Sequence, residues 1–140
     1  MESESFMYPY VKMFPEEAMN ECRVAYSRRH AELPDDNYAF IELYCTAPAC
    51  DCERVMINVI AKNSHKHLAT INYGFNPRDD MPGPFLDPLN KQSKYSNVFL
   101  SLFEQFIKEP EYIFKIKKHY KQVKTALKDP AHIIHTRIPK

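Results

Sequence analysis

Apolar residues in the second half of the chain recur at the spacing of two amphipathic helices. In residues 94–108 they fall three or four positions apart, at Tyr95, Val98, Phe99, Leu102, Phe103, Phe106 and Ile107. The same spacing continues over residues 110–128, at Ile113, Ile116, Tyr120, Val123 and Leu127. A period near 3.6 residues predicts a helix with one buried face. Because the link around Pro110 is very short, we expect the two helices to be neighbours joined by a hairpin or a bend.

The middle of the chain has the period-two alternation of β-strands. Three segments rich in β-branched and aromatic residues show it, at residues 38–44, 54–61 and 67–75. Residues 62–66 are polar and predict a turn between the last two strands. Short connections favour antiparallel pairing, so the three segments predict a meander.

The remaining segments complete an α+β prediction. Residues 15–33 are expected to form an N-terminal helix that begins at Pro15, with Glu16 and Glu17 in its first turn. The prediction is therefore a three-stranded antiparallel sheet with this helix and the C-terminal helix pair packed on it. Residues 1–14 and 129–140 are expected to be a loosely ordered lead-in and tail, although Phe6, Met7, Tyr8 and Tyr10 could dock on the core. The proline-rich segment 76–93 is expected to be a long loop, pinned to the core by Phe85, Leu86 and Leu89.

Length and composition favour one ordinary domain spanning residues 1–140. The chain is 44% hydrophobic and 26% charged, which is typical of a soluble globular protein. No apolar run has the roughly 20 residues of a membrane helix, and the first residues are acidic and polar, so we expect a cytoplasmic protein without a membrane partner. With only two glycines, a glycine-rich phosphate loop is excluded.

The charges are distributed unevenly along the chain. Residues 1–53 carry 11 acidic and 4 basic side chains, a net charge of −7, whereas residues 54–140 carry 7 acidic and 15 basic ones, a net charge of +8. This asymmetry predicts either attraction between the two parts of the folded chain or an acidic partner for the second part.

Three cysteines within eight residues carry the clearest chemical signal. Cys45, Cys50 and Cys52 follow the pattern C-x4-C-x-C, and the side chains of Cys50 and Cys52 point the same way if that segment is extended. Thiols remain reduced in the cytoplasm, where clustered cysteines are typical of a metal site, and three thiolates on one corner could bind zinc. A disulfide, three free thiols or an iron–sulfur cluster are the alternatives.

A closed zinc site needs a fourth ligand. His119 is the first candidate, because at about 100° per residue it lies at the edge of the buried face of its helix, and Cys22 is the second. A histidine in that position is also commonly a half-buried, hydrogen-bonded core residue. If no protein ligand closes the site, water would fill the fourth position, as in catalytic zinc sites.

Another spacing is similar to the signature of the zinc-dependent nucleoside deaminases. That signature is H-x-E followed by P-C-x-x-C, and here His30-Ala31-Glu32 precedes Pro48-Ala49-Cys50-Asp51-Cys52. The resemblance would imply zinc ligands at His30, Cys50 and Cys52, with Glu32 as the proton shuttle. The cysteine spacing departs from the signature, and the alternating α/β order of that family is absent.

The last predicted helix also carries a basic stripe, formed by Lys117, Lys121, Lys124 and Lys128. Clustered lysines can contact phosphates, although a solvated helix face is the simpler interpretation. The sequence therefore favours a zinc-stabilised module that binds an unidentified macromolecule. The alternatives are an enzyme with an open three-cysteine zinc site and a nucleic-acid-binding module that uses the lysine stripe.

Overall fold

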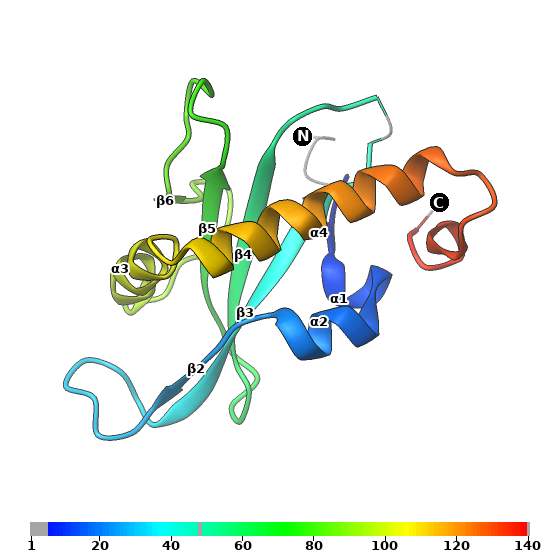
Figure 1. Cartoon of the computed structure of the whole chain (residues 1–140). Coiled ribbons are helices and arrows are strands. Elements are labelled where there is room, and N and C mark those ends of the chain that lie inside the picture. The colour runs from blue at the N-terminus through cyan, green and yellow to red at the C-terminus, as the bar shows by residue number, and fades with distance from the viewer. Residues whose placement is uncertain (1–5, 48, 140) are drawn as a thin grey trace.

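The computed structural model describes residues 6–47 and 49–139 of the chain, and its central element is an antiparallel sheet (Figure 1). The predicted meander is confirmed: β3 (Asp36–Cys45), β4 (Arg54–Ala61) and β5 (His67–Gly74) are consecutive and antiparallel. The prediction of only three strands is wrong. Three short strands extend the sheet to six, namely β1 (Met7–Pro9), β2 (Val24–Ser27) and β6 (Phe85–Leu86).

The two short N-terminal strands share one edge of β3. β1 pairs with the end of β3 near Cys45, and β2 pairs with its beginning near Asp36. The chain between them crosses over as two short helices, α1 (Tyr10–Met13) and α2 (Pro15–Glu21). The middle of that edge of β3 is therefore left to α1 and α2 instead of a strand.

The predicted helix over residues 15–33 is correct only in its first part. It begins at Pro15 as expected but ends at Glu21, and the backbone at Cys22 is already extended. The β-branched and aromatic residues that follow pair with β3, since an open strand edge offers hydrogen bonds to an extended segment. Arg23 fixes this exit from the helix, because its guanidinium lies over the rings of Phe106 and Tyr112 and forms an ion pair with Glu109 at 2.7 Å.

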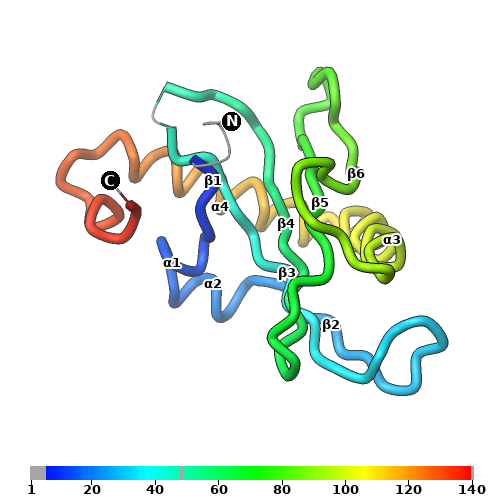
Figure 2. Tube along the Cα trace, turned by 180° about the vertical axis from the view of Figure 1, so that it is seen from behind, coloured from blue at the N-terminus to red at the C-terminus, as the bar shows by residue number. Residues whose placement is uncertain are grey.

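The two C-terminal helices are confirmed as α3 (Ser96–Phe106) and α4 (Pro110–Lys128). Figures 1 and 2 show α4 crossing the sheet while α3 is seen nearly end-on, so the short link makes a bend. The inward side chains of β3 pack against both helices: Tyr38 and Phe40 contact Phe99, and the hydroxyl oxygen of Tyr44 lies 3.3 Å from the carbonyl oxygen of Ile116. This face of the sheet is the hydrophobic core.

Both ends of the described chain pack on the core, and the docking of Tyr10 is one that the sequence left open. Tyr10 and Met13 are fully buried, and so is Ile134 in the short 3-10 helix η2 (Ile133–Thr136). Arg137 donates to the carbonyl of Met13 and joins the two ends. The part of the lead-in prediction that concerns residues 1–5 falls outside the described residues.

The long loop is held by polar contacts more than by the predicted apolar anchors. Phe85 and Leu86 are half-buried in β6, but Leu89 is 70% exposed. The buried carboxylate of Asp87 accepts from the side chain of Asn72 and from backbone in its own turn, and Gln92 makes two hydrogen bonds with the backbone of Thr70.

Candidate metal centre

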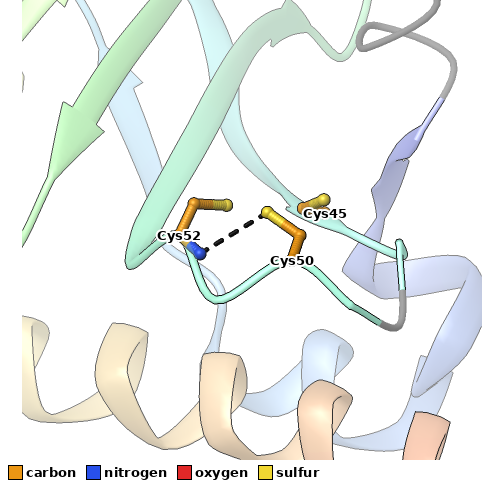
Figure 3. A group of neighbouring side chains, drawn as sticks. All are labelled: Cys45, Cys50 and Cys52. Atoms are coloured by element: carbon orange, nitrogen blue, oxygen red, sulfur yellow. Dashed lines mark hydrogen bonds between the residues drawn. The ribbon is translucent and has the colours of Figure 1, made fainter.

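The three clustered cysteines lie together where the chain turns from β3 into β4. Cys45 is the last residue of β3, and Cys50 and Cys52 lie on the loop just before β4. A turn in which the Cys50 N–H donates to the carbonyl of Ala47 at 3.1 Å folds this loop back on itself. As a result the three sulfur atoms lie within 4.8 Å of one another. Figure 3 shows the three side chains gathered on this loop. All four cysteines of the chain have free thiols.

The surroundings favour a thiolate at Cys50. The backbone N–H of Cys52 donates to Cys50 Sγ at 3.5 Å, and this contact, with the nearby Lys124 ammonium, lowers the pKa of Cys50. Burial raises the pKa of Cys52. Lys124 reaches the loop from α4, and its Nζ donates to the carbonyl of Cys45 at 3.0 Å and to that of Ala47 at 3.4 Å. Through Lys124, helix α4 thus places a positive charge near the cluster and holds the backbone of the cysteine loop by two hydrogen bonds.

His119, the predicted fourth ligand, is not part of this group. It is fully buried, and both ring nitrogens are in use: Nδ1 lies 2.6 Å from Oε1 of Glu42, and Nε2 lies 2.6 Å from Oε1 of Glu21. Tyr10 stacks on the imidazole with 4.2 Å between ring centroids. The geometry of α4 gives the reason. Tyr120 and Lys124 occupy the side of α4 that faces the cysteine loop, and His119 is rotated by about 100° toward α2 and β3.

Cys22, the second candidate, is also near Glu42 instead of the cluster. Burial and the Glu42 carboxylate raise the pKa of its thiol. The residues suggested by the deaminase-like spacing do not converge either. His30 is exposed on the turn between β2 and β3, where its Nδ1 accepts from the N–H of Glu32. Among the described residues, the ligand group contains Cys45, Cys50 and Cys52 and neither histidine.

The predicted lysine stripe lies beside the cysteine loop. Lys121, Lys124 and Lys128 line a cavity of about 380 Å³ together with Cys50 and Asp51. Lys117 and Lys121 border a neighbouring hollow beside Tyr120. The cysteine cluster and the lysine stripe, which are far apart in the sequence, therefore lie on the same surface.

Sequence reasoning missed the buried polar network around His119. Burial alone would lower the pKa of His119, but the carboxylates of Glu42 and Glu21 outweigh it and raise that pKa. The Tyr44 hydroxyl donates to the same Glu42 oxygen at 2.6 Å, and Lys118 forms an ion pair with Glu21 at 2.8 Å. A signal existed in the sequence: Glu42 alternates with Tyr38, Phe40 and Tyr44 on the inward face of a strand, where an acid requires a partner.

Comparisons with protein-family models, with curated proteins and with solved structures found no match to this chain. In the described part of the chain, no helix is both long and apolar enough to cross a bilayer.

Proposed function

We propose that this protein is a metal-binding module in which the thiolates of Cys45, Cys50 and Cys52 hold a zinc ion. The observation that carries the proposal is the convergence of the three sulfur atoms within 4.8 Å on one turn. Zinc–sulfur bonds of about 2.3 Å in a tetrahedral site place sulfur atoms about 3.8 Å apart. Small side-chain rotations would therefore bring the three thiols into a zinc site without refolding the loop.

The donor set favours zinc over other metals. Soft thiolates select zinc, Cu(I) or iron–sulfur clusters, whereas calcium and magnesium prefer oxygen ligands. An iron–sulfur cluster ordinarily takes four cysteines, and Cys22 lies beside Glu42 instead. The lowered pKa of Cys50 also assists binding, because a thiol must lose its proton to become a ligand.

Zinc at this position would stabilise the corner between β3 and β4. The metal would join the end of one central strand to the loop that starts the next, and its binding energy would add to the stability of the fold. Lys124 contributes by holding the carbonyls of Cys45 and Ala47 and by offsetting the charge of three thiolates. We infer that the adjoining lysine-lined surface is where the module meets another macromolecule.

The fourth position of the metal distinguishes a structural role from a catalytic one. The described ligand group offers three donors, and Cys50 borders a cavity of about 380 Å³. Water or a ligand from another molecule can reach the metal from that cavity. A three-thiolate zinc with an exchangeable fourth ligand is the second candidate, an enzyme in which zinc activates the bound water.

Metal content and thiol reactivity test the proposal together. Protein purified without chelator is expected to hold about one zinc per chain, and each of Cys45→Ser, Cys50→Ser and Cys52→Ser is expected to lose it. Cys22→Ser is the matched control and is expected to retain the metal. Native protein with no metal and three freely titratable cluster thiols would overturn the proposal.

A further inference from the structure

Another cavity is lined by none of the three clustered cysteines and does not depend on the proposed zinc site. It occupies the gap on the edge of β3 between β1 and β2, under α1 and α2, and has a volume of about 290 Å³. Its walls are mainly apolar and include Val11, Ala18, Met19, Val24 and Ile41. This volume equals about ten water molecules, which suits a small ligand with an aliphatic body.

One charged group borders this apolar cavity from the core. The side chain of Glu42 is 1% exposed and lines the cavity. Its Oε1 accepts from Tyr44 and contacts His119, but its Oε2 has no hydrogen-bond partner among the described residues. A buried carboxylate oxygen without a donor is costly, so a donor in the cavity would stabilise it. The neighbouring Cys22 offers only a weak S–H donor.

Glu42 is accompanied by a second carboxylate, that of Glu21, and both contact His119. Burial is the main cause of the raised pKa values of Cys22 and Tyr10, and the carboxylates of Glu42 and Glu21 raise both further. The nearby cations are already engaged: His119 lies between the two carboxylates, and Lys118 is paired with Glu21. At the rim, Arg23 is paired with Glu109. Lys62 also lines the cavity and repels a bound cation.

We propose that this cavity binds a small primary ammonium ion with an aliphatic body, whose N–H groups donate to Oε2 of Glu42. An ammonium supplies both the missing donor and a charge opposite to that of the carboxylate. The aliphatic body replaces water against the apolar walls, which adds the favourable burial that a bare ammonium ion lacks. The exposed side chain of Met19, 86% accessible, lies at the mouth.

The probe is 3-methylbutylammonium, titrated into isotopically labelled protein and followed through backbone amide shifts. Its matched competitors are 3-methylbutan-1-ol and 3-methylbutanoate, which keep the aliphatic body and change the charge. We expect the ammonium to shift amides in residues 11–24 and 39–42 and to bind more tightly than the alcohol. The carboxylate is expected not to bind. Equal binding of the three compounds, or shifts outside these residues, would overturn the proposal.

Two variants test the role of charge. Met19→Lys puts a cation at the mouth and is expected to weaken ammonium binding by about threefold or more, with little effect on the alcohol. Met81→Lys is the control, since Met81 is also an exposed methionine, 63% accessible, and does not line the cavity. Glu42→Gln should abolish the preference for the ammonium over the alcohol. If Glu42→Gln unfolds the protein, Met19→Lys is the decisive variant. An ammonium affinity of Met19→Lys equal to that of the wild type would refute the charge-based recognition.

Discussion

Replacing His119 by alanine tests whether the buried network stabilises the fold as its geometry suggests. The imidazole bonds to Glu42 and Glu21 at 2.6 Å each, and Glu42 is 1% exposed. Removing one member of a buried ion pair costs about 3–5 kcal/mol, because the other charge is left without compensation. Domains of this size are stable by about 5–15 kcal/mol. The His119→Ala variant should therefore still fold, but with a much lower free energy of unfolding.

The assay is urea denaturation followed by far-UV circular dichroism, which suits a chain that contains no tryptophan. The midpoint should fall without a change in slope, since the surface exposed on unfolding remains nearly the same. Lys118→Ala is the control. Lys118 also bonds to Glu21, but its side chain is 44% exposed, so the loss should be about 1 kcal/mol or less. A His119→Ala cost as small as that of Lys118→Ala would refute the reasoning.

A double variant separates the charge from the packing. In His119→Leu/Glu42→Leu the buried acid and its partner are both replaced by apolar side chains, so no unpaired charge remains there. Such replacements are often neutral or stabilising, and most of the stability lost in His119→Ala should return. If the double variant is as unstable as His119→Ala, the loss of side-chain packing would explain the effect, and the unpaired buried charge would not.

Comparing the wild type with the double variant also tests how the stability of the fold depends on pH. The two carboxylates raise the folded-state pKa of His119 above its usual value of about 6.5. Its contribution to stability is therefore fully present below about pH 6.5 and is lost as the pH rises through the folded-state pKa. The free energy of unfolding of the wild type, relative to the double variant, should fall over that interval. A constant difference between about pH 6 and pH 9 would contradict the assignment.

Two further predictions concern other parts of the molecule. In metal-free protein, iodoacetamide should modify Cys50 before Cys52, because the pKa of Cys50 is lowered and that of Cys52 is raised. Mass spectrometry of the digested protein measures the order of modification. The reverse order would contradict the prediction. The second prediction concerns the stripe lysines, Lys117, Lys121, Lys124 and Lys128. If this surface binds nucleic acid, changing all four to glutamine should abolish retention on an RNA column and reduce the salt dependence of binding. A wild-type protein that passes through the column at low salt would remove the reason for this hypothesis.

The elements that the sequence predicted correctly are those whose cause is local. The period of α3 and α4 follows from one buried face per helix, and Pro110 marks the observed start of α4. β4 and the turn at residues 62–66 also match, since alternation and polar turn residues act over a few positions. The proximity of the three cysteines was predictable because they lie on one short loop.

The errors come from interactions between distant parts of the chain. Residues 24–27 form a strand because the edge of β3 is open to them, a fact that no local pattern contains. β1 and α1 are ordered because Tyr10 fits against His119 and Tyr44, over a hundred and over thirty residues away. Leu89 was expected inside, but the buried Asp87 makes the anchoring contacts of its turn.

The functional residues divide in the same way. The sequence by itself determined that three thiols would be close, because they fall within eight consecutive residues. Only the tertiary structure decided which side chains of α4 face them. His119 and Lys124 are five positions, or about 140°, apart around the helix, so Lys124 contacts the cysteine loop while His119 contacts Glu42 and Glu21. The direction of a helix face depends on what the helix packs against, and that is fixed by the whole fold.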